Sequence, residues 1–389
     1  MKDFTFYSPT LFRFGMDSQS DTGELVKKFG GKRVLIHYGG GSVIKNGILD
    51  QIKKSLDHEG LFYTELGGAQ PNPVDTLVYK GIETGKKDHI DFILAVGGGS
   101  TIDSAKAIAA GMLYEGDFWD FLEGAPVDRA IPIGVVLTIS AAGSEGSPNF
   151  VITRQEGLLK RGTKSDVLRP VFSILNPMFT TTLPAYQTAS GGTDIMAHVF
   201  ERYFTNTKDV EVTDRLCEAV LLTMVRELPR AIADPENYEA RANIMWAGML
   251  AHNDICGVGR DQDWGSHWLE HELSALYDCA HGAGLAVIIP AWMQYVMHHD
   301  VMRFAQLAVR VFGVDMDFNH PENTAAEGIR RVKAFFSSLG MPVTFRELGA
   351  REEDIPILVE KIKVNPDGTL GTFLKIDKKG ATEIYRLAL

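Results

Sequence analysis

The chain has 389 residues, of which 45% are hydrophobic and 23% are charged, with 39 lysines and arginines against 50 aspartates and glutamates. This composition is that of an ordinary globular protein long enough for two domains, and it excludes a disordered, collagen-like or coiled-coil chain. The formal net charge of −11 disfavours binding to a phosphate backbone, so we expect no nucleic-acid partner.

The first residues and the cysteines indicate a cytoplasmic protein. Residues 1–7 (MKDFTFY) carry an acid and aromatic side chains where an export signal would have a basic start and an apolar run. Cys217, Cys256 and Cys279 are too few and too far apart for a disulfide framework, which suits a reducing compartment. The most apolar stretch, residues 283–297, is shorter than the ~20 residues of a membrane span, so we expect a buried helix and no membrane partner.

The first half of the chain alternates β-rich runs with helix-length segments, a pattern typical of a parallel sheet with crossover helices. The clearest strands are expected at residues 33–38, 91–96, 131–137 and 171–175. After Pro184, apolar residues recur at helical spacing, which predicts seven to ten helices and no clear strand before the C-terminus. We therefore expect an α/β domain over residues 1–184 and an all-helical domain over residues 185–389.

Two glycine-rich turns follow the first two of these strands. The second turn, from Gly97 to Lys106, reads GGGSTIDSAK. Glycines let a ligand approach the backbone closely, and a helix N-terminus offers N–H groups to an anion, so this turn predicts a pyrophosphate site. Its spacing fits neither the G-x-G-x-x-G fingerprint nor the P-loop, so neither a standard Rossmann unit nor a P-loop kinase is supported. The alternative is a simple tight turn.

The first turn bears on the choice of cofactor. Sites that prefer NAD usually hold the adenosine ribose hydroxyls with an acid, whereas the 2′-phosphate of NADP requires that this acid be absent. Residues 39–42 (GGGS) contain no acid, so the sequence favours NADP. A third loop, residues 137–145, offers hydroxyl groups that could bind adenine or phosphate, or could simply end a strand.

Acidic and imidazole side chains recur at metal-ligand spacing in the second half. Asp194 and His198 are four residues apart, as are His267 and His271, which places each pair on one face of a helix. His281 opens the next helical segment. One carboxylate with two or three imidazoles is typical of a metal site with mixed nitrogen and oxygen ligands, and it lacks the thiolates of a structural zinc site. The alternative is that each histidine is an ordinary polar side chain.

In these motifs the sequence resembles the iron-containing alcohol dehydrogenase family, most closely its butanol dehydrogenase branch. The similarity runs from about residue 5 to residue 385 and rests on the Gly97 turn, the loop at 138–145, the segment 183–201 and the segment 267–282. It implies a dehydroquinate synthase-like fold, with an α/β nucleotide-binding domain, an all-α C-terminal domain and an active site in the cleft between them.

The resemblance also assigns site residues. It implies that one divalent metal, Fe2+ or Zn2+, binds to Asp194, His198, His267 and His281, and that His271 lines the pocket near the metal without binding it. Because an imidazole can transfer a proton near neutral pH, His271 is also a candidate to relay the catalytic proton. The cofactor-binding residues that it implies are Gly39, Gly40, Gly41, Ser42, Gly97, Gly98, Gly99, Ser100, Asp103, Thr138 and Lys160. NADP-binding members of the branch place a lysine at the position of Lys160, so we expect NADP(H) to be preferred over NAD(H).

These observations and the resemblance predict an enzyme that reversibly reduces short- to medium-chain aldehydes such as butanal to alcohols. A cytosolic enzyme of this type is expected to be a homodimer. The side chains of Trp246, Met249, Trp264 and Trp268 in the helical half favour such substrates over phosphorylated ones. Two alternatives stay open. Polyol dehydrogenases and a cyclising synthase of sugar phosphates share the two-domain plan, and a non-catalytic protein that binds a nucleotide or a metal could carry the same motifs.

Overall fold

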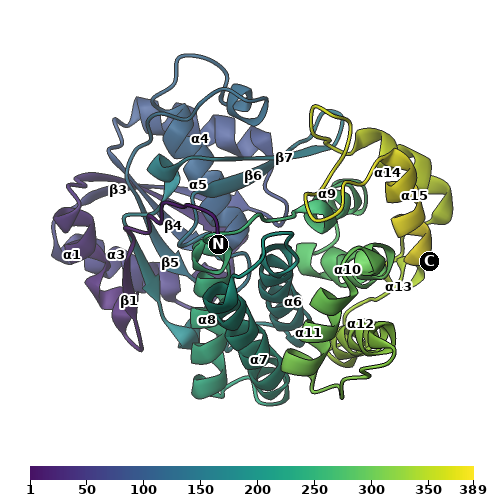
Figure 1. Cartoon of the computed structure of the whole chain (residues 1–389). Helices are drawn as coiled ribbons and strands as arrows, with labels where there is room; N and C mark the ends of the chain where they lie inside the picture. The colour runs from purple at the N-terminus through teal and green to yellow at the C-terminus, as the bar shows by residue number, and fades with distance from the viewer. The chain divides into compact units, whose positions relative to one another are not determined.

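The computed structural model describes all residues from Met1 to Leu389, and its chain folds into two compact units (Figure 1). The first, here called the α/β unit, comprises Tyr7–Leu183 and Pro235–Asn253. The second, here called the helical unit, comprises Met1–Phe6, Pro184–Asp234 and Asp254–Leu389. The domain boundary expected at 184/185 stays a prediction, and the compact units differ from it for residues 1–6 and 235–253.

A six-stranded parallel sheet forms the centre of the α/β unit. In spatial order its strands are β1 (Leu11–Phe14), β8 (Phe172–Leu175), β5 (Ile133–Leu137), β4 (Phe92–Gly97), β2 (Arg33–Gly39) and β3 (Phe62–Ala69). The four expected strands are confirmed as β2, β4, β5 and β8. The inner strands β4 and β5 are buried along their whole length, so their sequences are continuous apolar runs that predict strands clearly.

Helices cover both faces of this sheet. Along β2, Val34 and Ile36 belong to an apolar cluster with α1 (Thr22–Lys28) and α3 (Ile48–His58), whereas Leu35 belongs to a second cluster on the other face. This alternation follows from the two-residue period of a strand. The other elements of this part are α2 (Ser42–Lys45), α4 (Asp75–Lys87), α5 (Gly99–Gly111) and an antiparallel hairpin of β6 (Asn149–Arg154) and β7 (Leu159–Lys164).

A helix from the second half of the sequence, α8 (Tyr238–His252), also packs in the α/β unit. The ring of Trp246 on α8 meets the edges of Phe12 and Phe14 on β1, with ring centroids 5.8 and 6.1 Å apart. His252 lies 3.1 Å from the side chain of Asn149. The α/β unit is therefore completed by a segment that lies more than 50 residues beyond its sheet in sequence.

The first helix of the helical unit is α6 (Ala185–Tyr203), and no strand of either sheet follows Pro184. Ten α-helices follow this proline, α8 included, which confirms the predicted range of seven to ten. The buried helix expected at residues 283–297 is α10 (His281–Val296). No helix in the structure is both long and apolar enough to cross a bilayer. The remaining α-helices of the unit are α7 (Glu211–Ala233), α9 (Gly265–Tyr277), α11 (Val301–Phe312), α12 (Pro321–Ser338), α13 (Phe345–Leu348), α14 (Ile355–Lys361) and α15 (Lys378–Leu387).

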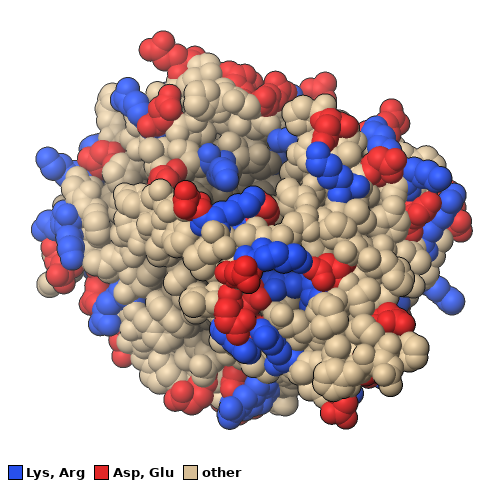
Figure 2. All heavy atoms as spheres, in the orientation of Figure 1, with Lys and Arg blue, Asp and Glu red and all other residues tan.

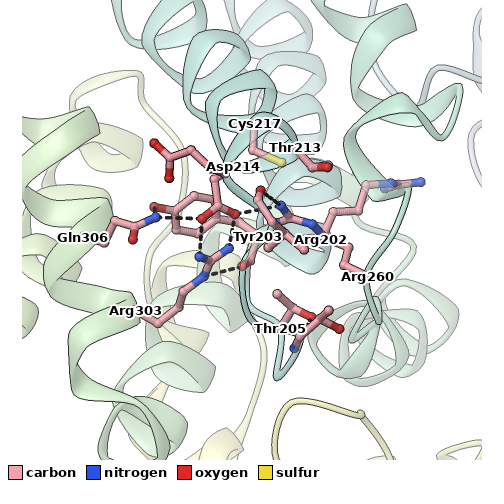
Figure 3. Close-up of polar contacts among 12 residues, drawn as sticks. Arg202, Tyr203, Thr205, Thr213, Asp214, Cys217, Arg260, Arg303 and Gln306 are labelled. Carbon is pink, nitrogen blue, oxygen red and sulfur yellow. Dashed lines mark hydrogen bonds and ion pairs between the residues drawn. The ribbon is translucent and has the colours of Figure 1, made fainter. Parts of the chain in front are cut away.

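A buried polar network holds α6, α7 and α11 together (Figure 3). The carboxylate of Asp214 on α7 accepts hydrogen bonds from both terminal nitrogens of Arg303, at 2.6 and 2.5 Å, and from Arg260 at 2.7 Å. Burial would raise the pKa of Asp214, but the hydrogen bonds from Arg303 outweigh it and lower this pKa below its usual range. Arg260 donates in turn to the carbonyl oxygen of Arg202, and Arg202 donates to the carbonyl oxygen of His198 at 2.8 Å. The network thus fixes the end of α6 that carries His198.

Candidate metal centre and cofactor turns

Asp194, His198, His267 and His281 come together inside the helical unit. Ligand atoms of Asp194, His267 and His281 all lie within 4.8 Å of one another. The ring of His198 completes the group, since its centroid is 4.8 Å from that of His267 and its Nδ1 is 3.4 Å from Asp194 Oδ1. The structure therefore assembles all four residues that the sequence predicted as metal ligands.

Three helices present these side chains. Asp194 and His198 lie one turn apart on α6, His267 lies in the first turn of α9, and His281 is the first residue of α10. The start of α10 approaches α6 so closely that a Cβ on Gly282 would lie 1.9 Å from the carbonyl oxygen of Ser190. Only glycine allows this approach, so Gly282 is part of what places His281 beside Asp194.

Each of the three candidate imidazoles has its Nδ1 engaged by the protein. The Nδ1 of His198 donates to the carbonyl oxygen of Asp194 (3.0 Å), that of His267 donates to Glu201 Oε1 (2.7 Å), and that of His281 contacts Glu270 Oε2. A ring whose Nδ1 carries the proton offers the Nε2 lone pair to a metal. Nε2 of His267 is buried and has no hydrogen-bond partner, so these residues fit a divalent cation.

The electrostatics of the centre also suit a cation. Burial lowers the pKa of His198 well below 6.5, and the nearby His267 and Arg202 lower it further, so this imidazole is neutral and able to ligate. Burial would raise the pKa of Glu201, but the hydrogen bonds from His267 and Ser266 outweigh it, so this pKa lies below its usual range. The centre thus combines a neutral imidazole at His198 with a charged carboxylate at Glu201.

His271 lies beside this group and is partly exposed. Its ring centroid is 5.7 Å from that of His281, and its ligand atom lies within 4.8 Å of those of Glu270 and His281. The structure therefore places His271 next to the candidate ligands, on the same helix as His267. Its assignment as a proton relay stays a prediction.

The sequence analysis missed Glu201 and Glu270 as residues of the centre. Both are buried, and each touches one of the candidate imidazoles. A signal for Glu201 was present, because it follows His198 by three residues and so lies on the same face of α6. Of the apolar side chains expected to favour aldehyde substrates, Trp246 and Met249 lie on α8 in the α/β unit. Trp264 lies in the helical unit, with its ring centroid 5.1 Å from that of His267.

The turn from Gly97 to Ser100 joins β4 to α5. A Cβ on Gly97 would lie 2.4 Å from Thr101 Oγ1, so this close packing requires glycine. The N-cap residue Gly98 offers no side-chain cap, which leaves the N-terminal N–H groups of the 13-residue helix α5 for an anion. Thr138 lies at the neighbouring strand end, and its N–H donates to the carbonyl oxygen of Gly97 at 3.0 Å. This geometry fits a pyrophosphate.

The turn from Gly39 to Ser42 joins β2 to α2. Gly41 has a φ of 127°, which favours glycine, and a Cβ on Gly40 or Gly41 would meet open space. Lys160 on β7 is buried and donates to Asn72 Oδ1 at 3.0 Å, just beyond the end of the neighbouring strand β3. No acidic residue occurs among residues 39–42 or 67–69, at the ends of these two strands.

Asp103 and Lys106 on α5 form hydrogen bonds with other residues of the chain. The two oxygens of Asp103 accept hydrogen bonds from Ser144 Oγ (2.6 Å) and from the N–H of Val151 (2.9 Å). Lys106 Nζ donates to the carbonyl oxygens of Ser144, Ser147 and Asn149, and burial lowers its pKa to about 8. Together they hold the segment after β5 against α5. A direct contact between Asp103 and the cofactor stays a prediction.

A parallel sheet with glycine-rich turns and a carboxylate–imidazole centre are the parts of a metal-dependent, nicotinamide-dependent dehydrogenase. Residues 9–177 match the family model described as iron-containing alcohol dehydrogenase, and residues 188–389 match the C-terminal model of the same family. The chain therefore belongs to the iron-containing alcohol dehydrogenase family and is an NAD(P)-dependent alcohol dehydrogenase. This membership implies a divalent metal and a nicotinamide cofactor.

Individual relatives match over the full length. The chain is 40% identical over 388 residues to NADH-dependent butanol dehydrogenase A of Clostridium acetobutylicum, covering 99% of each chain. It is 36% identical over 392 residues to the NADPH-dependent aldehyde reductase YqhD of Escherichia coli, covering 100% of each. The crystal structure of NADH-dependent butanol dehydrogenase A from Thermotoga maritima superposes with a TM-score of 0.96 at 40% identity, covering 100% of this chain and 99% of that one.

Proposed function

We propose that this alcohol dehydrogenase interconverts short- to medium-chain aldehydes and alcohols, butanal and butanol among them, with NADP(H) as cofactor. Asp194, His198, His267 and His281 would hold one divalent metal, Fe2+ or Zn2+. The observation that carries this proposal is the buried Nε2 of His267, which has no hydrogen-bond partner, on a residue whose ligand atom lies within 4.8 Å of those of Asp194 and His281. The names of the butanol dehydrogenase and aldehyde reductase relatives support the substrate class.

When bound, the metal polarises the substrate oxygen and the nicotinamide supplies or accepts the hydride. The residues of the chain prepare the site for this chemistry. His198 stays neutral because burial lowers its pKa, so its lone pair is available to bind. The ring of Trp264 packs edge-on against that of His267, with centroids 5.1 Å apart. His271 would hold or release the alcohol proton, since an imidazole exchanges protons near neutral pH.

The preference for NADP(H) is supported by charge at the first glycine turn. Residues 39–42 carry no acid that would repel a 2′-phosphate, and Lys160 places a buried amine beside the end of β3. A cation that is already desolvated forms a strong hydrogen bond with a phosphate oxygen. The relatives named above include one NADH-dependent and one NADPH-dependent enzyme, so the preference must be measured.

The deciding experiment compares kcat/KM for butanal with NADPH and with NADH, on protein stripped of metal and reloaded with Fe2+ or Zn2+. The variant His267→Ala should lose metal and activity together, whereas His320→Ala, at an exposed histidine of the same unit, should keep both. Full activity in metal-free His267→Ala would overturn the proposal. Turnover of glycerol or 1,3-propanediol without turnover of butanal would favour a polyol dehydrogenase, and equal or better use of NADH would discard the cofactor preference alone.

We also propose that the enzyme acts as a homodimer on small aldehydes and alcohols without a macromolecular partner. Multi-angle light scattering should then give twice the chain mass of 42.8 kDa. A mass equal to one chain at micromolar concentration would refute the dimer and leave the proposed reaction untouched.

A further inference from the structure

We propose that Glu201 is the positioning residue of the metal centre, because one carboxylate both orients the imidazole of His267 and caps the helix that carries it. The proposal rests on the proposed function of the centre as a metal site. Glu201 lies on α6, the helix that also carries Asp194 and His198. One helix would therefore supply two metal ligands and aim a third that comes from α9.

Four donors converge on the two oxygens of Glu201. Oε1 accepts hydrogen bonds from Ser266 Oγ at 2.6 Å, from the N–H of His267 at 3.0 Å and from His267 Nδ1 at 2.7 Å. Oε2 accepts from the N–H of Trp264 at 2.6 Å. Glu201 is only 2% exposed, so these bonds form in a poorly solvated environment where charge-assisted hydrogen bonds are strong.

The first turn of α9 depends on this carboxylate. The first N–H groups of a helix lack partners within the helix and are normally capped by a side chain at its N-terminus. The N-cap residue of α9 is Trp264, which provides no side-chain cap and has a φ of 68°, a costly conformation for a bulky residue. Glu201 takes the N–H groups of Trp264 and His267 instead, and its negative charge faces the positive end of the helix.

The same carboxylate determines which nitrogen of His267 faces the centre. A carboxylate accepts a hydrogen bond but cannot donate one, so Nδ1 of His267 must carry the proton. Nε2, which is buried without a hydrogen-bond partner, then keeps its lone pair for a cation. Loss of Glu201 would free the ring to rotate or to change tautomer, and the start of α9 would lose its cap in the same step.

Glutamine cannot replace this glutamate. Its side chain has one accepting oxygen and one NH2 group, whereas both oxygens of Glu201 face donors. In either orientation the NH2 group would meet an N–H. Glu201→Gln should therefore weaken the affinity for Zn2+ about 10- to 100-fold, which is the usual cost of removing the partner of a metal-ligating histidine.

The test measures the dissociation constant of Zn2+ by competition with a chelating dye, on the full chain. Proton-coupled 15N spectra of histidine-labelled protein report whether Nδ1 of His267 carries the proton, which a general loss of stability would not change. Asp377→Asn is the matched control, because Asp377 caps α15 in the same unit by accepting from Gly380 at 2.8 Å. The control should bind Zn2+ as the parent does.

The proposal is supported if Glu201→Gln binds Zn2+ more weakly and loses the protonated Nδ1 of His267, and unchanged affinity with an unchanged tautomer would overturn it. If Glu201→Gln does not fold, Glu201→Asp decides: its charged but shorter side chain cannot reach both Trp264 and His267, so unchanged Zn2+ binding would again overturn the proposal. Unchanged Zn2+ binding in His267→Ala would instead overturn the proposed function itself.

Discussion

Buried carboxylates in this protein titrate differently because different groups lie beside them. Burial raises the pKa of Asp263 to about 7, helped by the nearby charge of Glu201, although three backbone N–H groups oppose this shift. Burial also raises the pKa of Glu145 to about 7. The hydrogen bonds to Asp214 and Glu201 outweigh burial, so the pKa of each of these two carboxyl groups is lowered. The chemistry of each acid therefore depends on contacts between residues far apart in the sequence.

Replacement of His271 should separate catalysis from metal binding. Loss of a proton relay typically costs 10²–10⁴-fold in rate, so we expect kcat of His271→Ala to fall about 100-fold or more, with the metal content per chain unchanged. Steady-state kinetics and elemental analysis on the same preparations check this, with His320→Ala as the control. Metal lost in proportion to activity would make His271 a ligand instead.

Replacement of Lys160 should change coenzyme use. A hydrogen bond to a charged group contributes about 1.5–3 kcal/mol, so Lys160→Ala should lower kcat/KM with NADPH about 10- to 100-fold and leave NADH nearly unaffected. Lys164 lies on the same strand with an exposed side chain, and Lys164→Ala is the control. An equal loss with both coenzymes would show that Lys160 supports the fold and does not bind the 2′-phosphate.

The sequence indicated these sites to different degrees. Asp194 and His198 were found because a helix brings residues four apart onto one face, and the glycine turns were found because glycine after a buried strand is a local signal. Glu201 and Glu270 were not assigned, since a single glutamate in a helix is ordinarily a solvated surface residue. Only the packing of α6 against α9 shows that Glu201 is buried.

At the scale of elements, the sequence analysis did not predict the edge strands β1 and β3 or the hairpin of β6 and β7. β1 and β3 each have a strand on one side only, so exposed and partly buried residues interrupt their apolar pattern. β6 and β7 form a separate two-stranded sheet, so each of them also has a strand on one side only. Their sequences are accordingly rich in polar and charged residues. α8 lies in the part of the chain that was predicted to be helical, but its packing in the α/β unit was not predicted, because periodicity reveals a buried face and not what covers it.

The loop that follows β5 should make stability depend on pH. Glu145, fully buried in this loop, has a folded-state pKa of about 7 against an ordinary value of 4.5. A raised folded pKa gives stability that is present below the unfolded pKa and is lost as pH rises through the folded one. The free energy of unfolding should therefore fall between pH ~4.5 and ~7, by on the order of 3 kcal/mol at most.

Denaturant titrations of the parent and of Glu145→Gln across this range would isolate the effect. The amide does not titrate, so the pH dependence should be flatter in Glu145→Gln than in the parent. Glu123→Gln, which removes an exposed glutamate of the same unit, should leave the parent's dependence unchanged. Identical profiles for the parent and Glu145→Gln would contradict the prediction.

At the scale of the whole molecule, the excess of acidic residues is not concentrated on the face that Figure 2 shows, where acidic and basic side chains are interspersed. Negative charge also lies inside the helical unit, where Asp194 and Glu201 are buried. Burying like charges is costly, and a bound cation offsets that cost.

Removal of the metal should therefore lower the melting temperature. A ligand at 100 times its dissociation constant stabilises the folded state by about 2.7 kcal/mol, so chelation followed by readdition of Zn2+ should lower and then restore Tm by several degrees. His267→Ala should show no such response. A parent protein whose Tm is indifferent to chelator, with loss of metal verified, would argue against a folded-state metal site.

The path of the chain also bears on biosynthesis. The α/β unit uses Pro235–Asn253, so its sheet is fully synthesised long before the helix that covers Phe12 and Phe14 emerges from the ribosome. Until residue 253 has left the exit tunnel, β1 lacks the indole that covers its aromatic side chains. A nascent chain stalled near residue 190 should consequently recruit chaperones or resist compaction, and a chain truncated after Leu183 should aggregate when it is expressed alone.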